Sequence, residues 1–275
     1  MRKDLVYDIP TRLFHWLFVL YFVTAIGITK TVGEHEPTFS YHMMAGLVLG
    51  FLVLFRLVWG FVGTEHARFS RFALNPKDLI SYLKGVATGD KRRWAGHNPA
   101  SSWAAVLMLG LGLGLVLTGY RMATGPENDT IKEVHELFAN SFLIIALLHI
   151  VGIIVHTLRH KEWIGLSMLS GRKDSVPAHE QITQSHGLVG LLLLLAVVGW
   201  VTYLNRQYDP KTQQLQLFGQ TLQLGELEDD EHEGKHHHEH GKKQADPEKA
   251  SEADHEHNES EHQEDEHEHH EMDGK

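Results

Sequence analysis

Two histidines in one apolar segment have a spacing that suits two separate binding sites. His135 and His149 are fourteen residues apart and bracket the apolar stretch that starts at Leu137. Fourteen residues turn an α-helix by nearly four full turns, so both rings would project from one side, about 21 Å apart along the axis. Ionisable groups at such depth in a membrane are costly and usually functional. The spacing therefore predicts two cofactors, one near each surface of a bilayer.

Two further histidines match these depths. His15 lies near the inner end of the first apolar segment, and His42 opens the second at the outer surface. We expect an inner pair, His15 with His149, and an outer pair, His42 with His135. Neutral imidazole is a good axial ligand for haem iron, which has two axial positions. Helical bundles build such sites from side chains on facing helices, so the four histidines predict two haems.

Small residues beside the histidines allow two interpretations. Gly46 and Gly50 follow His42 at four-residue steps, where they could leave room for a flat porphyrin. Pairs of this kind, which include Gly110 and Gly114, also mark close packing between membrane helices.

The elements that must position these residues are membrane helices. Five apolar stretches approach the roughly 20 residues needed to cross the hydrocarbon core, near residues 13–29, 42–62, 103–120, 137–155 and 187–204. The predicted fold is an all-α integral membrane protein, with a four-helix transmembrane bundle, a fifth transmembrane helix and a disordered C-terminal tail. The predicted parts are a dihaem four-helix domain, a linker with the fifth helix, a short outer-face segment and the tail, at residues 1–175, 176–205, 206–225 and 226–275.

Charge supports this division and indicates an orientation. Residues 226–275 contain twenty acidic and five basic residues, so the net charge of −10 comes from the tail, and the rest of the chain carries +5. With the N-terminus in the cytoplasm, the inside segments hold 14 Lys and Arg and the outside loops hold three. The positive-inside rule then predicts a multi-pass protein of the bacterial cytoplasmic membrane with a periplasmic tail. Alternation over Tyr208–Leu224 predicts a hairpin or surface strand at the outer face.

Other polar residues near the predicted inner surface have candidate roles. Arg12 and Arg56 could bind haem propionates, because Arg binds carboxylates bidentately; the alternative is contact with lipid headgroups. His97 and Asn98 precede the third apolar segment and could bind a quinone, since His can donate a hydrogen bond and exchange a proton. The alternative is that this GHNP sequence only forms a turn.

Two more histidines, His156 and His66, do not belong to the predicted pairs. His156 follows His149 by seven residues and shares its helix face, which makes it a rival inner ligand. His66 is interpreted as an ordinary surface residue.

The absence of Cys excludes disulfides, thiolate metal sites and Cys-attached haem.

The motifs around these residues resemble the bacterial cytochrome b561 family, which includes the b-type cytochrome subunits of nickel-iron hydrogenases. The resemblance covers roughly residues 4–175, and its motifs are VYDIPTRLFHW (Val6–Trp16), HMMAGLVLGFLVLFRLVWGFVGTEHARF (His42–Phe69), GHNP (Gly96–Pro99) and EVHELFANSFLIIALLHIVGIIVHTLRHKE (Glu133–Glu162). It implies a four-helix bundle with two b-type haems. The family's ligand pattern falls on His15, His42, His135 and His149.

The tail is predicted to be disordered, because it has almost no apolar residues. Its histidines and carboxylates suit Zn, Ni or Cu(II), with the densest run at His236, His237, His238 and His240. The alternative is a solvated acidic segment that attracts a basic periplasmic cytochrome.

The function expected is that of a dihaem b-type cytochrome that transfers electrons between the quinone pool and a periplasmic partner such as a c-type cytochrome. The nearest alternative passes electrons from a hydrogenase-like oxidoreductase to quinone, and the sequence does not determine the direction. Two alternatives from other classes are a metal-ion transporter with a metal-capturing tail and a purely structural membrane anchor. The expected partners are membrane lipid, quinone or quinol and one of these redox proteins, with no nucleic acid.

Overall fold

The described part of the chain is a mostly helical membrane protein, as the sequence predicts, with two small sheets at its ends. A computed structural model describes residues 3–33, 35–89, 98–161, 163–174, 176 and 181–225. Within these residues, five helices are long and apolar enough to cross a membrane. They are α1 (Ile9–Thr31), α2 (Ser40–Val62), α4 (Pro99–Thr124), α5 (Asp129–His160) and α7 (Gly187–Gln207). Each extends an expected span, and the tail from residue 226 lies outside the described residues.

Local sequence signals determine where three of these helices begin. The side chains of Asp8, Asn98 and Asn128 each accept a hydrogen bond from a backbone N–H in the first turn of α1, α4 and α5. Pro10 and Pro99 occupy first-turn positions of α1 and α4, where a missing N–H costs nothing. These caps set the helix starts, and so they set the direction in which later residues such as the histidines project.

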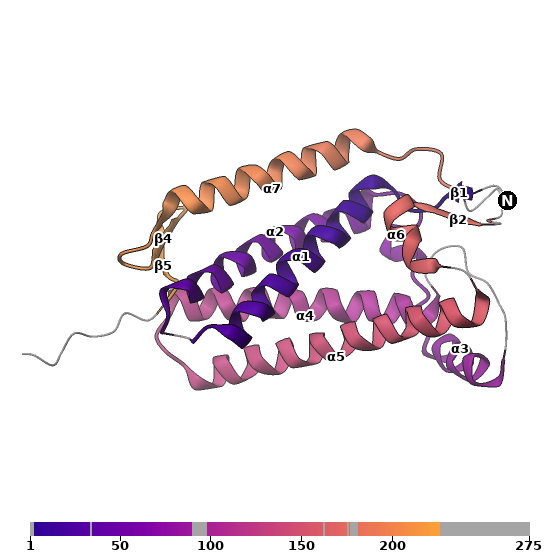
Figure 1. Ribbon diagram of the computed structural model, residues 1–275, viewed down its shortest axis with the longest axis horizontal. Coiled ribbons are helices and arrows are strands. Elements are labelled where there is room, and N and C mark those ends of the chain that lie inside the picture. Colours follow the sequence, from indigo (N-terminus) through magenta and orange to yellow (C-terminus); the bar gives the residue numbers. More distant parts are fainter. Residues whose placement is uncertain are drawn as a thin grey trace, which may run out of the picture. The chain divides into compact units, whose positions relative to one another are not determined.

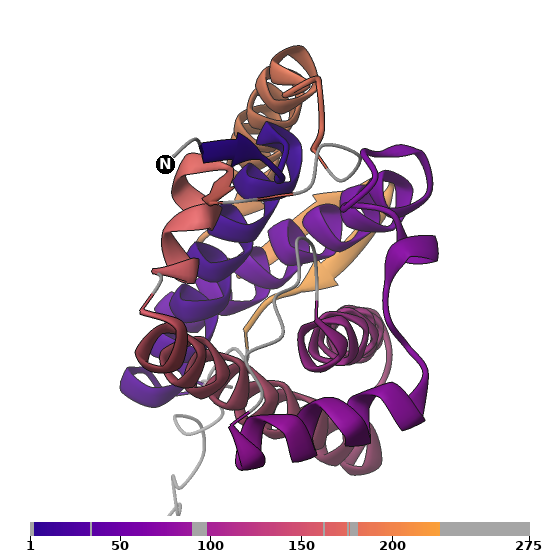
Figure 2. The same cartoon turned by 90° about the vertical axis from the view of Figure 1, so that its right-hand side faces the viewer.

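The helices α1, α2, α4 and α5 form the bundle, in which α1 packs on α2, α2 on α4 and α4 on α5 (Figure 1). Helix α7 lies outside this group, against α1 and α2, and Figure 2 shows it on the far side of α1 from α5. The Trp200 ring of α7 stacks on Phe51 with ring centroids 6.2 Å apart, and its Nε1 donates to the Leu47 carbonyl at 3.3 Å. Helix α7 therefore covers the side of the bundle that α1 and α2 form.

The bundle has an N-terminal end, where α1 begins, and a hairpin end, where the three-stranded sheet after α7 lies. At the N-terminal end, strand β1 (Lys3–Leu5) pairs antiparallel with β2 (Arg172–Asp174). The backbone N–H groups of Val6 and Tyr7 both donate to the Gly171 carbonyl, at 2.8 and 3.0 Å. Gly171 has φ +76°, and a Cβ there would lie 2.7 Å from the Tyr7 carbonyl oxygen. Glycine is therefore required at this junction.

Short helices surround the N-terminal end, namely η2 (Phe69–Arg71), α3 (Pro76–Thr88), η3 (Ile164–Leu166) and α6 (Ser167–Ser170). The sequence interpretation missed α3, although Asn75 caps it and Gly89 ends it in the left-handed conformation. The Arg159 guanidinium of α5 donates to the carbonyls of Gly85 and Val86. These bonds hold the end of α3 against the bundle.

At the hairpin end, three short strands form an antiparallel sheet in the order β3-β4-β5. They are β3 (Tyr208–Asp209), β4 (Gln214–Leu217) and β5 (Gln220–Gln223). Phe218 and Gly219 form the two-residue turn between β4 and β5 with φ of +50° and +83°, as a type I′ turn requires. The hairpin expected over Tyr208–Leu224 is therefore present. Another short helix, η1 (Pro37–Phe39), leads into α2 at this end.

Side chains from all four bundle helices meet midway between the two ends. The Phe142 ring of α5 lies 4.3 Å from that of Phe22 and 5.7 Å from that of Phe18, both on α1. A Cβ on Gly112 of α4 would lie 3.5 to 3.9 Å from side-chain atoms of Val53, Phe18 and Phe142. Phe142 is 3% exposed and Val53 1%. This central layer is apolar and closely packed.

Candidate haem sites

The structure brings His42 and His135 together at the hairpin end of the bundle. His42 is in the first turn of α2 and His135 in the second turn of α5, and their ring centroids are 6.4 Å apart at an interplanar angle of 76°. Two imidazoles on opposite sides of one metal ion need centroids roughly 6 Å apart, with a bond of about 2 Å on each side and about 1 Å from nitrogen to ring centre. The separation suits two ligands of a single iron.

The hydrogen bonds of both rings leave the same nitrogen free. His42 Nδ1 lies 3.0 Å from the Ala25 carbonyl oxygen, which can only accept, so this nitrogen carries the proton. His135 Nδ1 lies 2.8 Å from the Thr118 hydroxyl, which can donate to the Gly114 carbonyl at 2.8 Å or to the Leu115 carbonyl at 3.2 Å. With the hydroxyl hydrogen on either carbonyl, His135 Nδ1 is the donor to the hydroxyl oxygen. Each ring then keeps an unprotonated Nε2, the form that binds a metal, with its orientation held by the second nitrogen.

A pocket opens between these two rings, and its lining explains the nearby glycines. Gly46 lines the pocket, and a Cβ there would meet no atom within 4 Å. A Cβ on Gly50, one turn further along α2, would lie 3.0 Å from Val116 of α4. The porphyrin interpretation therefore suits Gly46, whereas the packing interpretation suits Gly50.

The second pair of small residues divides in the same way. A Cβ on Gly114 would lie 2.6 Å from the ring of Phe138, so this glycine lets α4 approach α5. A Cβ on Gly110 would meet nothing within 4 Å. Gly114 is therefore needed for close packing of α4 on α5, whereas the position of Gly110 has space for a side chain.

The N-terminal end holds the other predicted pair. His15 of α1 and His149 of α5 are close enough for an electrostatic interaction between their rings. His15 is partly buried, its ring meets Trp16 edge-on at 5.3 Å, and its buried Nδ1 has no hydrogen-bond partner among the described residues. A buried ring nitrogen without a partner fits a site that is completed by a bound group. The rival residue, His156, lies two turns further toward the end of α5.

Both candidate propionate ligands lie at this N-terminal end, and both already have partners. The Arg12 guanidinium donates to the Leu169 carbonyl of α6. Arg56 is 7% exposed, donates to the Ala67 carbonyl at 3.0 Å and lies over the Phe69 ring at 5.0 Å. Nε of Arg12 and Nη1 of Arg56 are buried and unpartnered among the described residues. Each guanidinium therefore supports local structure and retains one unpartnered nitrogen that could donate to a carboxylate.

A buried acid, Asp8, was missed by the sequence interpretation as a residue of this end. Asp8 is fully buried and accepts hydrogen bonds from Thr11 N at 2.8 Å, Trp59 Nε1 at 3.1 Å and the Thr64 hydroxyl at 2.6 Å. It ties the start of α1 to the end of α2. The cap-and-proline sequence Asp-Ile-Pro was a readable signal for the first of these bonds. The other two join residues far apart in the chain, which no local pattern reveals.

Three further residues from the sequence analysis have different outcomes. Asn98 caps α4 by accepting from Ser101 N at 2.8 Å, while His97 lies outside the described residues. The interpretation of His66 as a surface residue was wrong, because it is only 9% exposed. The loop after α2 folds back onto the helix, with Arg68 Nε donating to the Gly63 carbonyl at 2.8 Å, and this buries His66.

The sequence profile of prokaryotic cytochrome b561 matches residues 6–171, which span the whole four-helix bundle. The chain belongs to the prokaryotic cytochrome b561 family. It is therefore a membrane b-type cytochrome, whose haem b serves electron transport. Helix α7 and the hairpin of this cytochrome lie beyond the matched residues.

Curated relatives of this cytochrome have similar descriptions. A probable Ni/Fe-hydrogenase B-type cytochrome subunit from Bradyrhizobium diazoefficiens is 23% identical over 212 residues, which is 62% of this chain and 85% of the relative. A protein of the same description from Rhizobium leguminosarum bv. viciae is also 23% identical, over 61% of this chain and 87% of its own. One from Azotobacter vinelandii is 30% identical, over 46% and 62%. No solved structure gives a significant match to the chain.

Proposed function

We propose that this cytochrome holds two b-type haems, one between His42 and His135 and one between His15 and His149, and carries electrons across the membrane. Haem supplies the one-electron redox chemistry, and the four histidines hold the iron. The observation that carries the proposal is the 6.4 Å separation of the His42 and His135 rings, together with hydrogen bonds that leave both Nε2 atoms free. Membership of a cytochrome family favours this function over metal transport or a purely structural anchor.

Haem stoichiometry tests the proposal directly. The purified wild-type protein should contain two b-type haems per chain, and His42→Ala should retain one. His35→Ala is the matched control, because His35 is an exposed histidine in the loop before α2, and it should retain both. One haem or none in the wild-type protein would contradict the proposal.

The proposed orientation places the N-terminal end in the cytoplasm of a bacterium, at its inner membrane, and the hairpin end in the periplasm. The surplus of Lys and Arg in the loops of the N-terminal end supports it. Quinone is proposed to exchange electrons at the N-terminal end, with His97 as a contact. Asn98 is a weaker candidate, because its side-chain oxygen caps α4. Reduction of the purified protein by a short-chain quinol would support this exchange, and a lack of reduction would oppose it.

Two redox partners remain candidates on the other side of the electron path. The descriptions of the relatives favour a hydrogenase-like oxidoreductase that delivers electrons to quinone. The strands β3, β4 and β5 at the hairpin end lie outside the family match, which is compatible with a different partner such as a c-type cytochrome. In native membranes, reduction by hydrogen gas would favour the first partner. Reduction by quinol followed by reoxidation with an added ferricytochrome c would favour the second.

The tail is proposed to bind Zn, Ni or Cu(II) weakly through the histidines from His236 to His240, with the neighbouring carboxylates. Imidazole and carboxylate ligands suit these ions. Deletion of residues 226–275 should abolish retention of the metal while both haems remain. If the truncated chain retains as much metal as the full chain, the tail is not the binding segment.

A further inference from the structure

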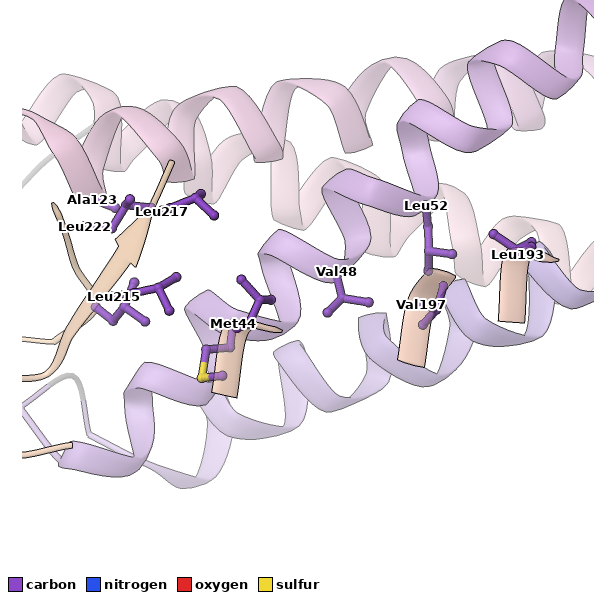
Figure 3. Close-up of a cluster of buried hydrophobic side chains, with 11 residues drawn as sticks. Met44, Val48, Leu52, Ala123, Leu193, Val197, Leu215, Leu217 and Leu222 are labelled. Atoms are coloured by element: carbon purple, nitrogen blue, oxygen red, sulfur yellow. The ribbon is translucent and has the colours of Figure 1, made fainter. Parts of the chain in front are cut away.

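The hairpin beyond the family match lies directly over the pocket between His42 and His135. Leu222 of β5 and Leu224 after it line that pocket together with both histidines, and they are 1% and 2% exposed. Ala123, near the end of α4, lines it as well and is 7% exposed. Figure 3 shows the leucines of the hairpin gathered beside Ala123. One wall of the pocket is therefore built by residues outside the part that matches the family.

Contacts with three helices fix the hairpin in this place. The Tyr120 hydroxyl of α4 donates to the side chain of Gln220. The Phe218 ring at the turn stacks with Trp200 and Tyr203 of α7, at 6.0 and 6.1 Å. On the side of α2, the Tyr41 ring lies 6.5 Å from that of Tyr208, the first residue of β3. The hairpin is thus a packed part of the bundle end.

The alternation along the strands separates an inner from an outer face. Leu215, Leu217 and Leu222 are buried toward the bundle, whereas Gln216 and Thr221 between them are exposed and hydrogen-bond to each other at 2.8 Å. A hairpin with one apolar face toward a pocket and one uncharged polar face outward has the pattern of a cover. Both histidines line the covered pocket.

We infer that the hairpin is a cap that excludes water from the haem site between His42 and His135, with Leu222 and Leu224 as its positioning residues. The inference rests on the proposed function for the identity of the bound group, although not for the cover itself. An oxidised bis-imidazole haem carries one more positive charge than the reduced form. A dry apolar wall disfavours that charge, so the cap raises the reduction potential of the haem at the hairpin end. It also keeps an electron-transfer partner from direct contact with this edge of the pocket.

The absence of Cys from the chain allows a test of the cover that does not depend on haem. Ala123→Cys places one thiol in the pocket wall, and Thr221→Cys places one on the exposed face of the hairpin. With a membrane-impermeant maleimide, the thiol at Thr221 should react quickly and the thiol at Ala123 slowly. Adding Leu222→Gln to Ala123→Cys should speed its labelling. Adding Thr221→Gln, a matched change on the opposite face of β5, should leave it slow.

A potentiometric titration of the holoprotein provides the second readout. Leu222→Gln should lower one of the two midpoint potentials by about 59 mV. This shift corresponds to about a tenfold change in the equilibrium constant for reduction of that haem. The affected haem should be the one that His42→Ala removes. Leu222→Met should restore the wild-type potential, and Thr221→Gln should leave both potentials unchanged. If Leu222→Gln does not fold, Leu222→Ala should give a smaller shift in the same direction.

The outcomes separate the cap from the proposed function. Equal labelling of Ala123→Cys with and without Leu222→Gln, or unchanged potentials in Leu222→Gln, would overturn the cap. A wild-type protein with fewer than two haems would instead overturn the proposed function, and the labelling result would still decide whether the hairpin covers the pocket.

Discussion

Phe22 of α1 and Phe142 of α5 pack with their ring centroids 4.3 Å apart. Phe142 lies seven residues from His135 and seven from His149, so it is on the same helix face, about 10 Å along the axis from each. The two histidine pairs are thus separated by a closely packed apolar layer. This layer holds α1 against α5 between the two proposed haem sites.

Truncation of this layer should destabilise the bundle. Phe142→Ala would leave a cavity among Phe18, Phe22 and Gly112, and we expect a loss of about 3 kcal/mol in the free energy of unfolding. Thermal loss of the haem absorbance in detergent measures it. Ile144→Ala is the matched control, because Ile144 is 58% exposed on the same helix, and it should have little effect. Equal stability of the two variants would contradict the role of the layer.

The identity of the ligand on α5 at the N-terminal end can be decided by two parallel substitutions. His149→Ala should lose one haem, because His149 is the residue that interacts with His15. His156→Ala should retain both haems, since it lies two turns further toward the helix end. Haem content and the reduced-minus-oxidised spectrum measure the difference. The reverse result would assign the iron to His156.

The hydroxyl of Thr118 should tune the haem at the hairpin end. His135 donates from Nδ1 to this hydroxyl at 2.8 Å, and such a bond makes the imidazole a more basic ligand, which favours oxidised iron. Thr118→Val removes this acceptor and leaves the Leu115 carbonyl as the remaining partner of His135, so one midpoint potential should rise, opposite in sign to the effect of Leu222→Gln. Thr118→Ser keeps the hydroxyl and should keep the potential. Equal potentials in the Val and Ser variants would show that the bond has no influence.

The Asp8 carboxylate should be important for assembly of the N-terminal end. Asp8→Ala removes the α1 cap and leaves the Trp59 N–H buried without its partner. The expected cost is on the order of 3 kcal/mol, about 1 from the cap and the rest from the unsatisfied donor. Thermal denaturation should show a lower Tm, and Asp8→Asn, which can still cap the helix, should lose less. A Tm unchanged by Asp8→Ala would show that these bonds contribute little.

The sequence alone determined the five apolar helices that are long enough to span a membrane and the positions of the four histidines along them. Both properties are local, because apolar length decides what can span a bilayer and helix geometry decides which residues share a face. The fourteen-residue step from His135 to His149 could therefore be read from the numbering. Alternation over Tyr208–Leu224 likewise predicted a hairpin or a surface strand, because it is a short-range signal.

Tertiary structure alone decided what these elements meet. Gly46 borders a pocket while Gly50 packs on Val116, and the one-turn spacing on α2 cannot distinguish them. Asp8 accepts hydrogen bonds from Trp59 and Thr64, which are more than fifty residues away in the chain. Leu222, near the other end of the described chain, lines the pocket beside His42. These contacts depend on how separate helices rotate and pack against one another, which is a property of the whole bundle and of no single segment.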